Sequence, residues 1–584
     1  MARKLDFTIS DLSKFMGREA SNEKSSIQRI IEGEPEEAII TGDVLGPLKS
    51  HAPEDRYYVL RAEKVYFSRF RPGDSVELAT ICSKTKKFKK LKDSSIKMVR
   101  FPEPGVIEVL IPGDGLPMNH EMEVFILPKS FSGIKWVLRQ RLQDIDRAGF
   151  ASKHFPINRQ AVKQKFSQVA EKLNTTQNEA LRFLIDNDFQ GLVQGPPGTG
   201  KTHLLVDLVR LAVESNIRVG LVSLTHAAVD NALGRILQSG LDPSQVVRIA
   251  SEKAKVKTDH YKDLSIDEIW SGSFKSFTTK IEYDDGGIEP HVYAATLHTW
   301  CLTKKTPEVD VLIIDEASQV PIYFYPFLKV LSSRVILFGD HKQLPPVIQV
   351  TNHNLPAEDI FSYEIEQGTY PMLEIQYRMN EGVQEWSSNR FYQGRLHPDE
   401  SNRNRDVIFG LDAISGRIGS KVVNMVSHSG PSHHNANKIE ASKVADLVWA
   451  LKTERSLPLE AIGIVTPHRA QAGAICAQLQ AKLGLAEMQK VLVDTVERFQ
   501  GQEREAMILS MGAEKDNSLK GDKGFLGDGR RLNVAVTRAR SRFYCFASEK
   551  LIENTKRQKN SEHLNSFFEW CSKSDQRKRK ENAS

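Results

Sequence analysis

A glycine-rich run with one lysine is the strongest chemical signal in the sequence. It consists of Gly195, Pro196, Pro197, Gly198, Thr199, Gly200, Lys201 and Thr202. This order fits G-x-x-x-x-G-K-[ST], in which backbone N–H groups close on phosphate oxygens, the lysine reaches the β- and γ-phosphates, and the last hydroxyl binds Mg²⁺. An apolar strand precedes the run and an apolar helix follows it. The pattern arises by chance in such a chain with odds of about one in a hundred, so a mere Gly/Pro-rich loop is the weaker interpretation.

Two adjacent carboxylates supply the metal side of such a site. Asp315 and Glu316 directly follow the apolar run 311–314. A carboxylate at the carboxyl end of a buried strand can hold the Mg²⁺ shell, so we expect Asp315 beside the metal and Glu316 placed to polarise the attacking water. The alternative is a pair of acids that only favour a helix N-terminus. Together with Lys201, the pair predicts ATP hydrolysis with Mg²⁺ as cofactor.

Parallel α/β domains must position these residues. From Gln177 onward, strand-like runs alternate with helical patterns, as a parallel sheet covered by helices requires. The expected strands are 191–194, 219–224, 311–314 and 335–338, then 462–465, 491–493, 506–510 and 543–546. The sequence thus predicts two α/β domains in tandem, residues 176–365 and 366–550. A polar insertion is expected at about 251–290 in the first of them.

Other patterns flank the two α/β domains. Short β-rich runs separated by turn clusters predict a small barrel or sandwich within residues 1–128. Its expected strands are 57–67, 75–82, 96–101, 106–111 and 121–127. Helical spacing of apolar residues then predicts a stalk of two helices in residues 129–175. Residues 551–584 are expected to form a C-terminal helix and a basic tail, whereas the first 50 residues carry little pattern.

Composition sets outer limits on function. The chain has 584 residues, 40% of them hydrophobic and 26% charged, which argues against disorder. The net charge of +6 permits nucleic-acid binding without requiring it. No apolar run of about 18 residues occurs, so no membrane span is expected, nor is a signal peptide. The five cysteines lack metal-ligand spacing, which favours reduced thiols in an intracellular protein without structural zinc or an iron–sulfur cluster.

Four further motifs follow in order. They are GDHKQLPP at 339–346, QYRM at 376–379, VDTVERFQGQE at 493–503 and RLNVAVTRAR at 531–540. With these motifs the sequence resembles the superfamily 1 helicases over residues 173–547, specifically the branch that contains the RNA-surveillance helicase of nonsense-mediated decay. The resemblance implies two tandem RecA-like P-loop domains with an N-terminal β-barrel accessory domain and a helical stalk. It also implies an ATP site between the two domains and 5′-to-3′ movement on a strand.

The resemblance implies roles for individual residues that match its motifs. Nucleotide contacts are implied for Gln177 (reading adenine), Tyr377 (stacking near adenine), Gln343 (sensing the γ-phosphate) and Glu503 (from the second domain). Arg378 and Arg538 resemble arginine fingers, because planar guanidinium groups suit the charge of a transferred phosphoryl group. The alternative for Arg538 is a surface charge or a nucleic-acid contact. Arg540 cannot point the same way as Arg538. We therefore expect Arg540 to be a surface charge or a nucleic-acid contact rather than an arginine finger.

The resemblance also implies a track for single-stranded DNA or RNA across both α/β domains. The candidate contacts are Thr225, His226, Asn231, Thr296, Thr466, Arg469 and Thr495. Hydroxyl and amide groups at strand ends suit phosphate and sugar contacts, which position a strand without reading its bases. Each threonine could equally be a helix cap. Because these contacts go to the backbone, the sequence does not separate DNA from RNA.

Two clusters remain open to more than one interpretation. Seven lysines surround Phe88: Lys84, Lys86, Lys87, Lys89, Lys90, Lys92 and Lys97. They could clamp a nucleic-acid backbone or form a solvated loop, and the sequence favours neither. His428, His433 and His434 lie in a Gly/Ser/Asn-rich loop without a Cys or Asp partner at metal-ligand spacing, so a structural loop is favoured over a metal site.

Spacing separates the chain from neighbouring helicase types. Only about 28 residues lie between Thr466 and Asp494, so the large domain that the UvrD/Rep type carries there is not expected. The zinc module of the surveillance helicase and the cysteine-clustered nuclease domain of the replication helicase–nucleases are not matched either, so no nuclease activity is expected. The leading hypothesis is an ATP-driven translocase that unwinds duplexes. The alternatives are an ATPase that remodels protein–nucleic-acid complexes, and a scaffold with a vestigial NTPase, against which the intact ATP-site residues argue.

Overall fold

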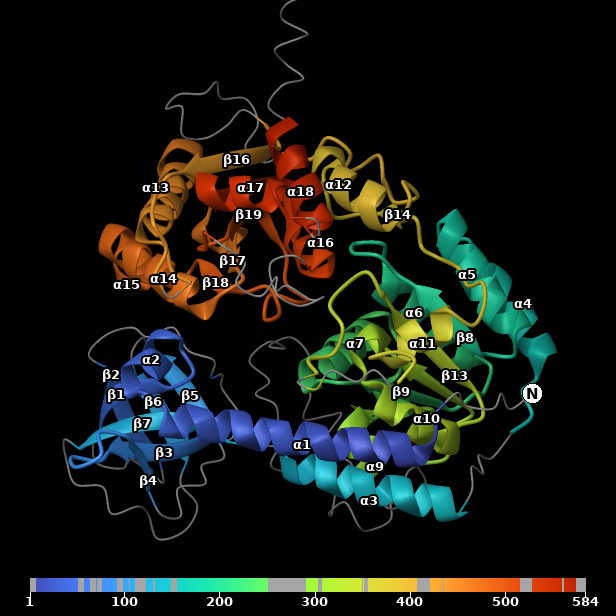
Figure 1. The fold of residues 1–584 in the computed structure, drawn as a ribbon. Coiled ribbons are helices and arrows are strands. Elements are labelled where there is room, and N and C mark those ends of the chain that lie inside the picture. Colours follow the sequence, from blue (N-terminus) through green and yellow to red (C-terminus); the bar gives the residue numbers. More distant parts are fainter. Residues whose placement is uncertain are drawn as a thin grey trace, which may run out of the picture. The chain divides into compact units, whose positions relative to one another are not determined.

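Two compact units make up the chain in the computed structural model (Figure 1). The structure describes residues 7–50, 57–62, 70, 76–91, 98–103, 106–110, 122–129, 132–148, 155–249, 290–302, 307–348, 350, 355–406, 421–433, 435–514, 528–558 and 561–573. The first unit comprises Met1–Asn22, Phe131–Tyr377 and Arg395–Asp399. The second comprises Glu23–Ser130, Arg378–Gly394 and Glu400–Ser584.

Six parallel strands form the main sheet of the first unit. Their spatial order is β10 (Val246–Ile249), β11 (Val292–Thr296), β9 (Val219–Ser223), β12 (Val311–Ile314), β13 (Val335–Gly339) and β8 (Gly191–Gln194). Every pairing is parallel, so the carboxyl ends of the strands lie at one edge. That edge is where the glycine-rich run and the Asp315–Glu316 pair begin.

Helices cover both faces of this sheet. One face packs against α4 (Arg159–Ala170), α5 (Thr175–Asp186), α6 (Lys201–Glu214) and α7 (His226–Gln238). The opposite face packs against α3 (Ser132–Ala148), α9 (Leu297–Leu302), α10 (Tyr325–Leu331), α11 (Ile360–Ile365) and the start of α1 (Ile9–Glu32). Along β12, Val311 and Ile313 face the first set, whereas Leu312 and Ile314 face the second, as the two-residue period of a strand dictates.

Short elements complete the first unit. They are the 3₁₀ turns η1 (Pro243–Gln245), η4 (Ala317–Gln319) and η5 (Ile322–Phe324), and the strand pair β14 (Ile375–Gln376) and β15 (His397–Pro398). The start of α1 lies beside α3, since the Arg139 guanidinium donates to the Ser13 hydroxyl over 2.9 Å (Figure 1). Just before α1, the Phe7 ring meets the Tyr363 ring with centroids 5.4 Å apart. Phe7 and the start of α1 therefore belong to the core of the first unit.

A second parallel sheet lies in the second unit. Its order is β16 (Val423–His428), β20 (Ala539–Ser548), β19 (Arg504–Ser510), β17 (Ile462–Thr466) and β18 (Leu492–Thr495). One face packs against α13 (Lys438–Arg455), α14 (Arg469–Leu483) and α15 (Leu485–Met488). The remaining helical elements are α12 (Glu381–Phe391), α16 (Gly529–Thr537), α17 (Glu549–Lys556), α18 (Glu562–Lys573) and η6 (Leu459–Ala461). Aromatic contacts Trp386–Phe567 and Phe543–Phe567, at 5.2 and 6.1 Å, tie α12, β20 and α18 together.

A seven-stranded antiparallel sheet, formed by residues 45–128, also belongs to the second unit. Its order is β4 (Phe88–Lys90), β3 (Val76–Ile81), β7 (Glu123–Pro128), β1 (Leu45–Ser50), β2 (Tyr57–Ala62), β6 (Val106–Leu110) and β5 (Met98–Glu103). One core includes side chains from β1, β2, β3, β6 and β7. On the other face, residues of α1 and α2 (Pro35–Ile40) pack with Phe88, Phe125 and Leu127.

The expected elements can be compared with these. Both parallel sheets and all five strands expected before residue 128 are present. Helices α3 and α4 lie within residues 129–175 but pack on opposite faces of the first unit's sheet, so a stalk made of the two stays a prediction. The strands β1 and β4 and the long helix α1 were not expected. The pairings between described residues run from β4 to β5 without joining these two strands, so closure into a barrel stays a prediction. The expected insertion at 251–290 and the basic tail lie outside the described residues, apart from position 290 at the edge of the first.

Candidate active site

The glycine-rich run forms the turn between β8 and α6. Gly198 and Gly200 have φ of +78° and +77°, a backbone region that side chains other than glycine adopt at a cost. A Cβ on Gly200 would lie 2.6 Å from the Gln177 amide nitrogen. One on Gly195 would lie 2.9 Å from the Lys201 Cβ. The glycines are therefore needed both for the turn and for its close packing.

Lys201 lies between the two predicted carboxylates. Its Nζ donates to Glu316 Oε1 over 2.6 Å and lies 3.2 Å from Asp315 Oδ1. Burial lowers the pKa of Lys201, but the attraction of Asp315 and Glu316 outweighs it and the pKa lies above its ordinary value. The lysine is therefore charged, and two carboxylates stand where phosphate oxygens could. This donor set fits a nucleoside triphosphate with a divalent cation.

Glu316 has an unusual backbone. It directly follows the β12–Asp315 segment with φ of +55°, in the left-handed region that few residues other than glycine adopt. Its side chain is 36% exposed, compared with 8% for Asp315. Asp315 is therefore enclosed, while Glu316 is partly exposed to solvent, as a residue that orients a water molecule requires. Backbone strain of this kind is typical of functional sites.

Asp340 holds the predicted phosphate sensor. Its carboxylate accepts from the Gln343 amide and from the Gln194 amide, each over 3.1 Å, and Asp340 is 1% exposed. It therefore links the end of β8 to the turn after β13. The positioning roles of Asp340 and Gln194 were missed by the sequence reasoning, although Asp340 lies inside the motif at 339–346.

Gln177 and Tyr377 also lie against the phosphate loop. The Gln177 side chain accepts from the Asn174 backbone N–H over 3.2 Å and donates to the Thr199 carbonyl over 3.1 Å. The Tyr377 backbone N–H donates to the Gly198 carbonyl over 2.8 Å, and its hydroxyl accepts from Asn174 over 2.9 Å. The first unit thus brings both predicted adenine-contacting residues to the loop. The capping pair Asn174–Gln177 had its own signal, because N-x-x-Q before an apolar run is a helix-start pattern.

The predicted residues of the second unit form their own cluster. Glu503 accepts from both Arg378 and Arg540, and Arg378 also donates to the Thr537 carbonyl over 3.0 Å. Burial raises the pKa of Glu503, but these two arginines outweigh it and the pKa lies below its ordinary value. Arg538 is 4% exposed and lies at the end of α16. Arg378, Glu503 and Arg540 are therefore brought together, with Arg540 paired to Glu503 and Glu505 rather than left as a surface charge.

The candidate strand contacts of the first unit lie at the carboxyl edge of its sheet. Thr225 caps α7, since its hydroxyl accepts from the Ala228 N–H over 3.2 Å. His226 Nδ1 accepts from the buried Arg248 over 2.9 Å. Burial chiefly, and Arg248 next, lower the pKa of His226 against the opposing effect of Asp230. His226 is therefore neutral at pH 7 and can offer a hydrogen bond but no charge.

Thr296 and Asn231 differ in exposure. Thr296 is 4% exposed and shares a 2.9 Å hydrogen bond with Thr299. Asn231 lies exposed on α7. Of these two, Asn231 is the side chain that a strand could reach without rearrangement.

The candidate strand contacts of the second unit are two buried threonines and one half-buried, ion-paired arginine. Thr466 and Thr495 end neighbouring strands in register and are 0% and 8% exposed. The Arg469 guanidinium donates to the Thr41 carbonyl over 2.9 Å and pairs with Asp43. Contact of these residues with a strand stays a prediction, and it requires them to become more exposed.

The lysine-rich segment is a β-hairpin. Lys84, Lys86, Lys87, Lys89 and Lys90 are exposed around the β3–β4 turn, and Lys92 and Lys97 lie outside the described residues. Phe88 does not join them at the surface, because its ring packs on Phe125 with centroids 5.5 Å apart.

The histidine-rich segment differs from its expected form. His428 ends β16 and is buried, His433 bridges to Ala436, and His434 lies outside the described residues. His428 is therefore part of the domain core rather than of a loop.

The two parallel α/β sheets and the enclosed lysine–carboxylate site define a P-loop nucleotide-binding protein with tandem α/β domains. Two family models, both described as AAA domain, match residues 172–285 with 289–351 and residues 358–550. These matches cover the two sheets and the sites on them.

Named relatives agree with this class. The DNA polymerase alpha-associated DNA helicase A of Schizosaccharomyces pombe is 29% identical over 431 residues, 63% of this chain and 62% of the relative. Regulator of nonsense transcripts 1 of Dictyostelium discoideum is 30% identical over 415 residues, 63% of this chain and 30% of the relative. The DNA replication ATP-dependent helicase/nuclease DNA2 of Gallus gallus is 29% identical over 416 residues, 69% of this chain and 39% of the relative.

The chain belongs to the superfamily 1 helicases and resembles the branch that holds the RNA-surveillance helicase. It spans between 30% and 62% of the length of the three relatives named. Within the described residues, no helix is both long and apolar enough to cross a membrane.

Proposed function

We propose that this chain is an ATP-driven motor that moves 5′ to 3′ along a single strand of DNA or RNA and separates duplexes. The observation that carries the proposal is the placement of Lys201 against Asp315 and Glu316 at the carboxyl edge of a parallel sheet. The helicase relatives add the nucleic-acid part. An intracellular protein without a membrane partner is part of the same proposal.

The first unit would hold ATP and Mg²⁺. Phosphate oxygens would lie against the backbone of residues 195–200 and Lys201, Mg²⁺ against Thr202 and Asp315, and adenine against Gln177 and Tyr377. When bound, Mg²⁺ neutralises charge on the transferred phosphoryl group. Glu316 would orient and polarise the attacking water, and Gln343, held by Asp340, would sense the γ-phosphate.

The second unit would supply the arginines. Arg378 and Arg538 are proposed as arginine fingers, which stabilise the charge that develops during phosphoryl transfer. Glu503, already paired with Arg378, would hold that guanidinium in place and contribute to the nucleotide site. Because a planar guanidinium offers several donors in a fixed fork, lysine would not replace either arginine.

The strand would be held through its backbone. The proposed contacts are Thr225, His226, Asn231, Thr296, Thr466, Arg469 and Thr495, with the lysine hairpin as an added electrostatic clamp. We also propose that the antiparallel sheet closes into the barrel that presents this hairpin. Contacts to the nucleic-acid backbone position a strand without reading its base sequence.

Steady-state ATP hydrolysis tests the motor. Purified protein is assayed alone, with poly(dT) and with poly(U), and Glu316→Gln is assayed beside it. We expect one polymer to stimulate hydrolysis and Glu316→Gln to lower kcat by about 10²–10⁴-fold, the usual share of general acid–base catalysis. Glu179→Gln, the same change on the exposed face of α5, should leave kcat unchanged. Hydrolysis that no polymer stimulates, or that survives Glu316→Gln, would contradict the proposal.

Strand displacement separates unwinding from remodelling. Partial duplexes carrying a 5′ or a 3′ single-stranded tail are offered with ATP. We expect release only from the duplex with the 5′ tail, because a 5′-to-3′ motor must load there. Release from the 3′ tail would reverse the proposed polarity. Stimulated hydrolysis without release from either would favour an ATPase that remodels protein–nucleic-acid complexes.

A further inference from the structure

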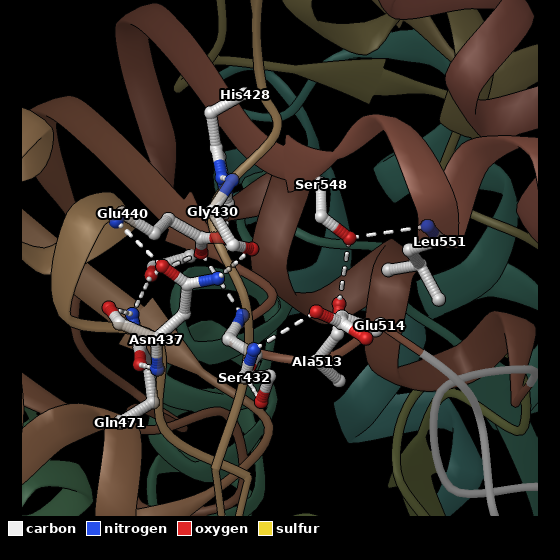
Figure 2. Close-up of polar contacts among 12 residues, drawn as sticks. His428, Gly430, Ser432, Asn437, Glu440, Gln471, Ala513, Glu514, Ser548 and Leu551 are labelled. Atoms are coloured by element: carbon white, nitrogen blue, oxygen red, sulfur yellow. Dashed lines mark hydrogen bonds and ion pairs between the residues drawn. The ribbon is translucent and has the colours of Figure 1, made fainter.

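Five buried polar side chains lie at the carboxyl edge of the second unit's parallel sheet. Figure 2 labels four of them, His428, Asn437, Glu440 and Gln471. This edge cluster consists of His428, Asn437, Glu440, Gln471 and Ser510, each at most 4% exposed. His428 ends β16, Ser510 ends β19, and Gln471 lies in the first turn of α14, directly after β17. Neither the proposed ATP site nor the proposed strand contacts include any of the five.

The Glu440 carboxylate is the centre of the edge cluster. Its Oε2 lies 2.6 Å from His428 Nε2. Its Oε1 accepts from the Ser510 hydroxyl over 2.6 Å and from the Gly512 backbone N–H over 2.9 Å. A fully buried carboxylate costs free energy unless donors surround it. Here three donors from two segments, the end of β16 and the end of β19, meet on one group.

Hydrogen bonding fixes the state of the histidine. The Gly430 backbone N–H donates to His428 Nδ1 over 3.1 Å, so Nδ1 is the acceptor. Nε2 must therefore carry the proton, which it donates to Glu440. His428 is thus held as one tautomer by partners on both sides. In the other tautomer its Nδ1–H would point at the Gly430 N–H, and two donors would face each other.

Asn437 and Gln471 extend the edge cluster to α14. The Asn437 backbone N–H donates to the Gln471 side-chain oxygen over 2.7 Å, and the Gln471 amide donates to the Ser510 hydroxyl over 2.8 Å. Gln471 lies two residues after Arg469, a proposed strand contact. The cluster therefore sets where α14 begins relative to the end of β19.

The segment after β19 rests on the same cluster. Gly512 has φ of +63°, and its carbonyl accepts from the Ser432 hydroxyl over 2.7 Å. A Cβ on Gly512 would lie 2.7 Å from the Gln471 side chain. Ser510 and Gly512 thus lie against Glu440 and Gln471, while the next two residues, Ala513 and Glu514, are held by Ser548 and Ser432 (Figure 2).

We propose that Glu440 is a positioning residue for the binding of single-stranded nucleic acid by the second unit. It fixes the ends of β16 and β19 and, through Ser510 and Gln471, the segment 466–469 that carries two proposed strand contacts. An apolar side chain would fill the same volume at less cost, so a carboxylate with three donors serves geometry rather than stability. This inference rests on the proposed function, because it concerns the same strand.

The substitution Glu440→Gln tests the role of the carboxylate. The amide keeps an acceptor for Ser510 and Gly512 but turns an N–H toward the His428 Nε2–H. We expect the apparent Kd for the stimulating polymer, measured as a labelled 20-mer, to rise about fivefold or more. Without polymer, the KM for ATP and kcat should stay within about twofold, because none of the five cluster residues is a proposed ATP-site residue.

A second substitution should restore what the first removes. His428→Gln places an amide near the Nε2 position. This amide can present its nitrogen to the Glu440 carboxylate, or its oxygen to the amide that Glu440→Gln introduces. We expect His428→Gln alone to bind the strand nearly as wild type does, and the double variant to recover most of the affinity that Glu440→Gln loses. If Glu440 and His428 only stabilised the fold, the losses of strand affinity in the two single variants would add in the double variant.

Controls separate the possible failures. Glu454→Gln makes the same change at the far end of α13 and should leave strand binding unchanged. If Glu440→Gln does not fold, Ser510→Ala removes one donor and should weaken strand binding in the same direction. Wild-type strand affinity in Glu440→Gln, or equal losses of strand affinity and polymer-free hydrolysis, would overturn the inference. A wild-type protein that binds no strand would instead overturn the proposed function.

Discussion

Single residues of the phosphate loop are fixed by geometry more than by chemistry. Gly200 is held at φ of +77° with Gln177 close to where a Cβ would lie. Glu316, which follows β12 outside the phosphate loop, adopts φ of +55° without being glycine, so the site retains backbone strain in order to place a carboxylate. Lys201 remains charged between two acids. A nucleotide therefore meets a preformed turn and a lysine whose present partners it can replace.

Removing the lysine should separate hydrolysis from strand binding. Lys201→Ala takes away the positive charge that phosphate oxygens require, so we expect kcat for ATP to fall by at least about a hundredfold. Binding of a labelled single strand should stay within about twofold of wild type, since the proposed strand contacts lie on other segments. Fluorescence anisotropy and a phosphate-release assay measure the two. Full hydrolysis in this variant would refute the assigned site.

The site was predictable where its residues follow strands of one parallel sheet. Lys201, Asp315 and Glu316 each follow a strand of one parallel sheet, so the alternation of strands and helices was enough to bring them together. The link from Asp340 to Gln194 and the pairing of Arg469 with Asp43 join residues far apart in sequence, and no local pattern announces them. Phe88 lies among the surface lysines in the sequence, but its side chain is buried and packs on Phe125.

Among the elements, the turn between α5 and β8 connects several parts of the first unit through ion pairs. Asp188 in this turn pairs with Arg334, at 3.0 Å, and with Arg159 of α4, at 2.9 Å. Arg334 is 2% exposed and also donates to the Phe155 carbonyl over 2.7 Å. One carboxylate thus joins α4, the start of β13 and the entry to the phosphate-loop strand.

Asp188→Asn should destabilise the first unit in a pH-dependent way. Asparagine tolerates the positive φ at this position, so the change removes charge without altering the backbone, and we expect a loss of about 3 kcal/mol in unfolding free energy. Burial raises the pKa of Asp188, but Arg334 and Arg159 outweigh it and the pKa lies below its ordinary value of 3.8. A lowered folded pKa gives stability above the unfolded pKa that is lost as pH falls through the folded one.

The measurement is urea unfolding at several pH values. The difference between wild type and Asp188→Asn should be full at pH 7 and shrink below about pH 4. Asp186→Asn breaks only the exposed 3.7 Å pair with Lys163 and should cost about 0.5 kcal/mol or less. A difference that persists unchanged into acid would contradict the assignment.

The lysine hairpin gives a prediction for nucleic-acid binding. Lys86, Lys87 and Lys89 are exposed on the β3–β4 turn. If they contact phosphates, replacing all three by Ala should lower the slope of log affinity against log salt by up to about 2, since each contact to a single strand contributes about 0.7. The matched change of the exposed Lys443, Lys490 and Lys556 should leave the slope unaltered. An unchanged slope in the hairpin variant would identify it as a solvated turn.

For the whole molecule, the two parallel sheets were predictable and the course of the chain through them was not. Apolar strands alternating with helices specify a parallel sheet in any setting. Helix α1 also carried a signal, because Ile9, Leu12, Phe15, Met16 and Ala20 repeat at helical spacing. What no periodicity could reveal is that its start packs in the core of a unit whose other residues begin at Phe131.

That placement has a consequence for the chain as it is made. Phe7 meets Tyr325 and Tyr363, so its partners are translated roughly 350 residues after it. At about 5–20 residues per second, the apolar stripe at the start of α1 must wait roughly 20 to 70 s for them. Throughout that time the nascent chain carries an exposed apolar helix face and an incomplete first unit. The start of α1 is therefore among the last parts of the first unit to reach its final place.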